Sequence, residues 1–219
     1  MTCRNAAAAG FGIVWASPTS LPRPRMQRRL LITSAAAAVL ALAACKDGSP
    51  GPGAAKAPAV PVSTAAIESQ AKGFVHGSPM SVRTVYVFFD PQCPHCSALW
   101  RAAKPLKGQA KFVWIPVGLI NKSSEAQGAA LLAAKDPVAL MDEHEASMAA
   151  QKGGISGMGD FDAQREAVKK NTDLMNSFGF ASVPSIVAQH AQTGALVTRE
   201  GSMPTAALAA LLGLQAPAQ

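Results

Sequence analysis

The order of apolar segments predicts an α/β domain with a helical insertion before a closing β-hairpin. A strand over 83–89 is followed by a helix over 96–106 and a second strand over 111–115. No strand-like run follows Ile120 for about sixty residues, and two short strands around a glycine-containing turn come only after that gap. Alternating strands and helices are typical of α/β proteins.

The first two strands are rich in β-branched and aromatic residues. The strand at 83–89 contains the continuous apolar run from Val85 to Phe89, and the strand at 111–115 contains the run from Phe112 to Ile115. Continuous apolar runs of this length are typical of strands buried on both faces. The helix between them is expected to bend or end near Pro105, because proline removes a backbone donor.

Three helices are expected in the insertion, over about 121–179. Polar caps are expected at their starts: Ser124 with Gln127 as a capping box, Asp136 before Pro137, and Asp160 or Asp162. The third helix is expected to end at Gly179.

The closing hairpin is expected from strands at 185–189 and 195–199, around Gln192-Thr193-Gly194. A final helix is expected to start at Pro204. The folded domain is therefore placed at 67–216.

Residues 1–66 are expected to lie outside that domain. Residues 1–25 offer no core and are expected to be a gene-model extension, with translation starting at Met26. Residues 26–44 combine a basic start with an apolar core of about 15 residues, short of the ~20 that span a membrane, which is typical of a secretory signal.

The end of this signal resembles that of a bacterial lipoprotein. The order Leu42-Ala43-Ala44-Cys45 implies cleavage before Cys45 and acylation of its sulfur. Residues 45–66 are then a lipidated cysteine and a Pro/Gly-rich tether, which reaches up to ~50 Å if it is polyproline-like. We expect a protein held at the membrane by a lipid anchor.

The formal net charge of +7 falls to near +2 once the arginines that precede Cys45 are removed. Nucleic-acid binding requires a clustered basic face. No such cluster follows Cys45, so a nucleic-acid partner is not expected.

The number and positions of the cysteines indicate one reactive pair. Of the four cysteines, Cys3 precedes the expected mature chain and Cys45 is expected to carry lipid, which leaves Cys93 and Cys96. A secreted domain with no other thiol has no structural disulfide framework. We therefore expect this pair to be redox-active.

A cysteine pair spaced as in Cys93-Pro94-His95-Cys96 has three common interpretations. Half of a zinc site is disfavoured because structural zinc takes four ligands and no second cysteine pair exists. A chance pair is disfavoured by the strand, loop and helix around it. Reversible dithiol–disulfide exchange is favoured, with no metal and no cofactor beyond the Cys93–Cys96 disulfide itself.

The two thiols are expected to have different roles. Cys93 lies at a helix N-terminus, where unpaired amides and the helix dipole stabilise a thiolate, so it is expected to attack. Cys96, one turn further on, is expected to resolve the mixed disulfide. Pro94 suits the first helical turn, and His95 is expected to acidify Cys93 further, to a pKa of ~4 to 5.

Val183-Pro184 is the second candidate half of the site. A proline at the head of a strand can follow a cis bond. In a thioredoxin-type architecture the backbone before that proline faces the dithiol and pairs with the substrate chain. Substrate contact is therefore assigned to Pro94, His95, Val183 and Pro184.

The segment from Phe88 to Cys96 resembles the active-site segment of periplasmic thiol:disulfide interchange proteins of the DsbC/DsbG type. Further likeness to DsbG runs through four segments: Val117–Ile120, Leu132–Pro137, Glu143–Ser147 and Leu174–Gly179. The resemblance implies a thioredoxin fold with a helical insertion, a periplasmic location and a cis bond before Pro184. It also implies disulfide isomerase or reductase activity on secreted proteins, rescue of sulfenylated cysteines, and electrons from a DsbD-like membrane reductase.

Three departures from this family keep alternatives open. The family's amino-terminal dimerisation domain is replaced by the signal and tether, which favours a monomer. Pro94-His95 and Val183 are those of the oxidase DsbA, so a disulfide-donating enzyme served by a DsbB-like partner is the alternative. A lesser alternative is a thioredoxin-like copper-binding module, although such modules generally need a third soft or imidazole ligand.

Overall fold

The computed structural model describes residues 60–217. The expected extension, the signal, Cys45 and most of the tether lie outside these residues. Among the helices within 60–217, none combines the length and hydropathy that crossing a membrane requires.

The described residues form five strands, six α-helices and one 3₁₀ helix. In chain order they are α1 (Thr64–Gln70), β1 (Phe74–Gly77), β2 (Thr84–Phe89), α2 (Pro94–Ala103), η1 (Lys104–Leu106), β3 (Lys111–Pro116), α3 (Lys122–Ala133), α4 (Pro137–Ala149), α5 (Asp162–Ser177), β4 (Ser185–Gln189), β5 (Leu196–Glu200) and α6 (Thr205–Leu212). The α/β class and the helices inserted before a closing hairpin are confirmed.

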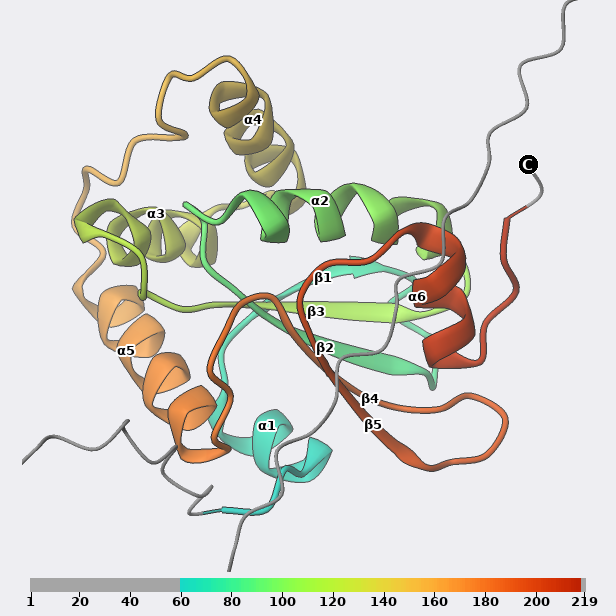
Figure 1. The fold of residues 1–219 in the computed structure, drawn as a ribbon. Coiled ribbons are helices and arrows are strands. Elements are labelled where there is room, and N and C mark those ends of the chain that lie inside the picture. The colour runs from blue at the N-terminus through green and yellow to red at the C-terminus, as the bar shows by residue number, and fades with distance from the viewer. Residues whose placement is uncertain (1–59, 218–219) are drawn as a thin grey trace, which may run out of the picture. The chain divides into compact units, whose positions relative to one another are not determined.

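One five-stranded sheet carries the domain, in the order β1-β3-β2-β4-β5. The central strand β2 pairs in parallel with β3 and antiparallel with β4. Helices α2 and α6 cover one face of the sheet, where α4 also contacts β1 and adds Met141 to the core, while α1 and α5 cover the other face and α3 packs along α5 (Figure 1).

Both faces of β2 are buried, which explains its continuous apolar run. Val85, Val87 and Phe89 pack in the core under α2 and α6. Tyr86 and Phe88 pack in the opposite core, with α1 and α5. Side chains alternate between faces along a strand, so a one-residue change in register would exchange the two sets.

Aromatic packing fixes α2 on the sheet. Trp100 of α2 is almost fully buried, and its ring lies edge-on to Trp114 of β3 with a centroid separation of 4.9 Å. Trp114 in turn packs against Phe89 at 5.5 Å. Edge-to-face pairs contribute about 0.5–1.5 kcal/mol beyond area burial. This packing holds the helix whose N-terminus carries Cys93.

The N-terminal edge of the domain differs from expectation. Helix α1 begins at Thr64, inside the expected 45–66 tether, with Ser63 as N-cap and Ile67 buried against the sheet. The folded domain therefore includes residues that precede 67, where it was expected to begin. Strand β1 was also missed. It is only four residues long, and it is formed by pairing with β3 and not signalled by a sequence pattern of its own.

Two helix starts also differ from expectation. The capping box of α3 is formed by Asn121 and Ser124, because Asn121 offers an earlier cap, so α3 begins before Ser124. Neither Asp160 nor Asp162 caps α5; its N-cap is Phe161 and Asp162 is already helical. Asp136 caps α4 as expected, through a 3.0 Å bond from the Ala139 amide.

Candidate active site

Cys93 occupies the N-cap position of α2, at the end of the short turn that follows β2. Its amide donates to the Asp90 carbonyl at 3.0 Å, and its own carbonyl accepts from the amides of Cys96 and Ser97 at 3.0 and 3.2 Å. Pro94 is the first helical residue, where its missing N–H leaves no intrahelical bond unmade. The sequence thus places the thiol of Cys93 beside the unpaired amides of the first helical turn.

The two thiols have opposite acidities. The pKa of Cys93 falls from 9.0 to about 6, first because the Cys96 thiol donates a hydrogen bond to its sulfur and then through the amides of Cys96 and His95, while burial acts in the opposite direction. The pKa of Cys96 is strongly raised, mainly by burial and then by the neighbouring Cys93. At neutral pH Cys93 is a thiolate and Cys96 a thiol.

The pKa of Cys93 is low, as expected, but lies above the expected ~4 to 5. The physical reason is the burial of the sulfur, since only 6% of the Cys93 surface is exposed. Burial disfavours the charged form of a thiol.

The Val183 backbone faces the nucleophile. The peptide bond between Val183 and Pro184 is cis, and the Cys93 sulfur lies 3.5 Å from the Val183 carbonyl oxygen. Pro184 precedes β4, which pairs with β2 and so returns this loop to the site. The structure thus brings together residues about ninety positions apart.

His95 and Pro94 are exposed beside the dithiol. The charge of His95 contributes to lowering the pKa of Cys93. Its Nδ1 lies 3.5 Å from the Ser202 hydroxyl, which precedes α6. Of the residues predicted from the sequence, Pro94, His95 and the Val183 backbone therefore lie around Cys93, whereas Cys45 lies outside the described residues.

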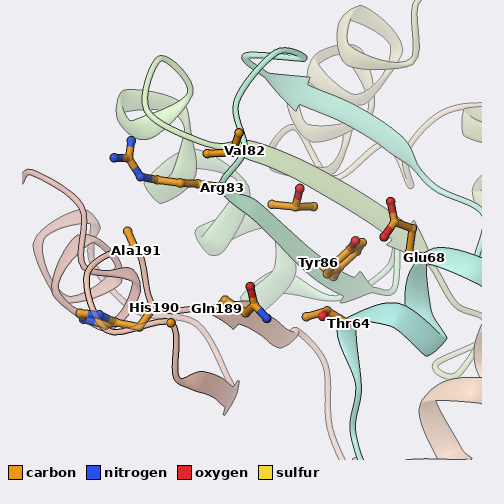
Figure 2. Close-up of a pocket in the computed structure, with 10 residues that line it drawn as sticks. Thr64, Glu68, Val82, Arg83, Tyr86, Gln189, His190 and Ala191 are labelled. Carbon is orange, nitrogen blue, oxygen red and sulfur yellow. The ribbon is translucent and has the colours of Figure 1, made fainter.

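One pocket in the described part of the chain lies away from the dithiol. It has a volume of about 390 Å³ and lies between the start of β2 and the end of β4, at the opposite end of β2 from Cys93. Arg83, Tyr86, Glu68 and His190 line it from separate elements (Figure 2). None of the predicted site residues contributes to it.

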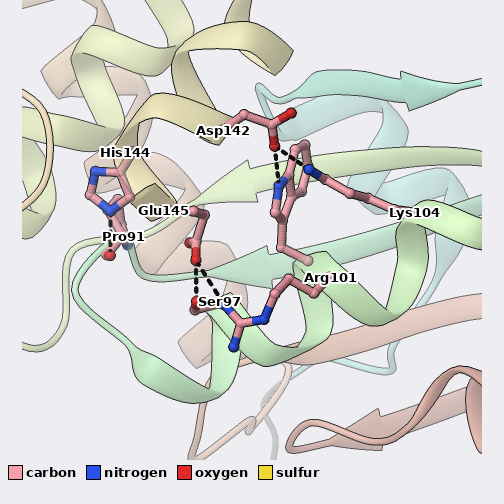
Figure 3. Close-up of polar contacts among 8 residues, drawn as sticks. Pro91, Ser97, Arg101, Lys104, Asp142, His144 and Glu145 are labelled. Carbon is pink, nitrogen blue, oxygen red and sulfur yellow. Dashed lines mark hydrogen bonds and ion pairs between the residues drawn. The ribbon is translucent and has the colours of Figure 1, made fainter. Parts of the chain in front are cut away.

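A second pocket of about 210 Å³ opens directly beside Cys93, between α2 and α4. Eight residues line it: Pro91, Cys93, Pro94, Ser97, Arg101, Glu145, Met148 and Ala149. Glu145 accepts a hydrogen bond from Ser97 and lies 3.6 Å from Arg101 (Figure 3). Burial raises the pKa of the Glu145 carboxyl, against the opposing effect of Ser97.

Glu145 and Asp90 were not among the residues predicted for the site. The carboxylate of Asp90 is fully buried and accepts from the amides of Gln92, Leu119 and Ile120 at 2.8, 2.7 and 2.9 Å. It joins the turn before Cys93 to the loop after β3. In the sequence, the only sign of this role for Asp90 was its position between an apolar strand and Pro91.

Fold and site together define a thioredoxin-fold domain with a redox-type dithiol. A periplasmic thioredoxin-like protein from Salmonella enterica serovar Typhimurium superposes with a TM-score of 0.55 at 18% identity, over 68% of this chain and 92% of that one. At that identity the likeness shows the fold alone. No family model matches the chain.

Curated relatives make the relation more specific. The thiol:disulfide interchange protein DsbG of Pseudomonas aeruginosa is 35% identical over 150 residues, which cover 66% of this chain and 56% of DsbG. DsbG of Escherichia coli is 35% identical over 104 residues, 47% of this chain and 42% of that protein. The chain is thus related to DsbG-type thiol:disulfide interchange proteins, and it spans about half the length of these relatives.

Proposed function

We propose that the chain is a periplasmic thiol–disulfide oxidoreductase of the DsbG/DsbC type. In this proposal it reduces or isomerises disulfides in secreted proteins and reduces sulfenylated cysteines. One observation carries the proposal: an acidic Cys93 thiol at a helix N-terminus faces the Val183 carbonyl, with a protonated Cys96 behind it.

The reductive reaction begins with the Cys93 thiolate. It attacks one sulfur of the client disulfide, the client S–S bond breaks, and a bond between Cys93 and the client forms. The departing client sulfur leaves as a thiolate and takes a proton from water. The acidity of Cys93 supports this step because the thiolate is the nucleophile.

Cys96 completes the exchange. Its thiol loses a proton and attacks the Cys93 sulfur, which breaks the mixed disulfide and forms the Cys93–Cys96 disulfide. The client has then gained two electrons and both of its sulfurs are thiols. Burial of Cys96 keeps it protonated until Cys93 is occupied. A DsbD-like membrane reductase would restore the dithiol.

In isomerisation a second client cysteine attacks the mixed disulfide in place of Cys96. The client sulfur bonded to Cys93 then enters a new client disulfide, and Cys93 leaves as a thiolate. A leaving thiol of low pKa departs faster. The same acidity of Cys93 therefore supports both reactions.

The second candidate is a monomeric, DsbA-like oxidase that donates the Cys93–Cys96 disulfide and is reoxidised by a DsbB-like partner. Pro94-His95 favours it, because the charge of His95 stabilises the Cys93 thiolate and hence the reduced form. A stabilised reduced form makes the disulfide a stronger oxidant.

The proposed location follows from the residues that precede the described domain. Acylation at Cys45 would hold the enzyme at a membrane and facing the periplasm, with the Pro/Gly-rich tether as spacer. Metabolic labelling with a fatty-acid probe should label the wild type and not Cys45→Ser. Equal labelling of both would reject the anchor.

An insulin-reduction assay tests the activity. The wild type should accelerate precipitation of the insulin B chain in the presence of dithiothreitol, and Cys93→Ser should abolish the effect. Tight Cu(I) binding by the wild type, lost in Cys96→Ser and unaccompanied by reductase or client-oxidase activity, would favour the copper-binding alternative instead.

Thiol trapping in cells tests the direction of electron flow. A mostly reduced Cys93–Cys96 pair is expected for the reductase or isomerase. A mostly disulfide-bonded pair would favour the oxidase.

A further inference from the structure

We propose that the helical insertion positions the nucleophile, through two positioning residues, His144 of α4 and Gln127 of α3. They hold Pro91 and Gln92, the two residues that directly precede Cys93. This inference rests on the proposed function of the dithiol and assigns the insertion a role in that function.

His144 is the first of these contacts. Its ring is fully buried, its Nε2 lies 2.7 Å from the Pro91 carbonyl oxygen, and its Nδ1 lies 3.2 Å from the Ile155 amide nitrogen (Figure 3). The Ile155 amide can only donate, so Nδ1 accepts and the proton sits on Nε2. One neutral tautomer thus joins the active-site turn to the segment between α4 and α5.

Gln127 is the second contact. Its Nε2 donates to the carbonyls of Gly153 and Ile155 at 2.8 and 2.9 Å, and its Oε1 accepts from Nε2 of Gln92 at 2.6 Å. The other end of the Gln92 amide accepts from Asn121 at 3.2 Å. Three of the four hydrogen-bonding positions of the Gln127 amide, counting two lone pairs on the oxygen, are thus used, and both ends of the Gln92 amide are held.

The segment between α4 and α5 closes tightly on both positioning residues. Gly154 has φ +92°, and a Cβ there would lie 2.5 Å from Cε1 of His144 and 2.9 Å from Nε2 of Gln127. A residue with a side chain does not fit this approach. The segment between α4 and α5 therefore limits the positions open to His144 and Gln127.

The position of Pro91 and Gln92 matters because the Cys93 thiolate depends on short-range contacts. The Cys96 thiol and the amides of His95 and Cys96 hold the charge, and a hydrogen bond weakens steeply as its geometry departs from linear. A displaced turn would move the Cys93 sulfur relative to these donors. The charged or titratable groups around Cys93, namely His95, Cys96, Asp90, Glu145 and Arg101, stay unchanged in the variants below.

Two conservative substitutions of His144 test the inference. In His144→Gln the side-chain nitrogen reaches the place of Nε2 and can still donate to Pro91. In His144→Asn the shorter amide reaches only the place of Nδ1, so the contact with Ile155 is kept and the contact with Pro91 is lost. The readout is the rate of Cys93 alkylation by iodoacetamide between pH 4 and 9, followed by mass spectrometry.

We expect His144→Asn to move the midpoint of this profile upward by about one pH unit, which lowers alkylation at pH 6 about fivefold. His144→Gln should keep the wild-type midpoint. Ser177→Ala serves as control: it removes the 2.7 Å bond from Ser177 to the Leu174 carbonyl at the end of α5, away from His144 and Gln127, and should leave the midpoint unchanged. Unfolding midpoints of all variants are measured alongside.

An unchanged midpoint in His144→Asn, or equal shifts in His144→Asn and His144→Gln, would overturn the inference. Should Asn at position 144 prevent folding, Gln92→Met tests the same turn from its own side and should raise the midpoint in the same way; an unshifted Gln92→Met would then overturn it. A wild-type midpoint above about 7 would instead contradict the proposed function. The two failures are therefore distinguishable.

Discussion

Replacing Cys96 should change the acidity of Cys93 in a way that depends on the hydrogen bond between the two thiols. That bond is the largest contribution to the lowered pKa of Cys93. Cys96→Ala removes the donor, whereas Cys96→Ser replaces the thiol by a hydroxyl, which also donates. The two variants therefore differ mainly in this one interaction.

The size of the effect follows from the strength of a hydrogen bond to a charged group, about 1.5–3 kcal/mol. One pKa unit corresponds to about 1.4 kcal/mol, so Cys96→Ala should raise the pKa of Cys93 by about 1–2 units from its value of about 6. At pH 6 the thiolate fraction would fall from about one half to about 1–9%. Alkylation at that pH should slow about 5- to 50-fold.

The assay is the pH dependence of iodoacetamide alkylation, checked by thiolate absorbance at 240 nm. Cys96→Ser should titrate close to the wild type. An unshifted midpoint in Cys96→Ala, or a shift of the same size in Cys96→Ser, would refute the role of the thiol–thiol hydrogen bond.

Three further predictions concern stability. Burial lowers the pKa of His76, whose ring packs on Trp100. Because the unfolded chain then binds a proton more readily than the folded one, the free energy of unfolding should fall as the pH drops below about 6.5. Urea unfolding of His76→Phe should show a smaller fall. Burial raises the pKa of Glu145, so its contribution to stability should be lost as the pH rises from about 4.3 through the higher folded value; Glu145→Gln should flatten this decline, and parallel curves for the two proteins would count against it. Ile67→Ala should destabilise the domain by about 2–4 kcal/mol because Ile67 anchors α1; a loss under about 1 kcal/mol in urea unfolding would mean that α1 is not part of the core.

The central part of the fold was predictable because its signals are local. The apolar runs of β2 and β3, Asp136 at the start of α4 and the glycine turn before β5 each carry their own pattern. Strand β1 and helix α1 lack such patterns. Strand β1 forms by pairing with β3, and helix α1 is held by the burial of Ile67. Both are contacts between distant parts of the chain.

The residues of the candidate site also fall into those with a local sequence signal and those without one. Cys93 and Cys96 were predictable from spacing and setting, and Val183-Pro184 from its place at the head of a strand. Glu145, His144 and Gln127 were not, since each contacts the active-site turn or the start of α2 from the insertion, at residues 35 to 53 positions away in the sequence. A histidine or glutamine in a helix carries no such signal by itself.

The division of labour between the two cysteines is tested most directly by trapping the mixed disulfide. Reduced Cys96→Ser and Cys93→Ser variants are mixed with a disulfide-bonded client, quenched with acid and mapped by mass spectrometry. We predict that Cys96→Ser accumulates a client bonded through Cys93 and that Cys93→Ser accumulates none, because Cys96 is buried and protonated. An equal yield of mixed disulfide through Cys96 would contradict the assignment of Cys93 as the nucleophile.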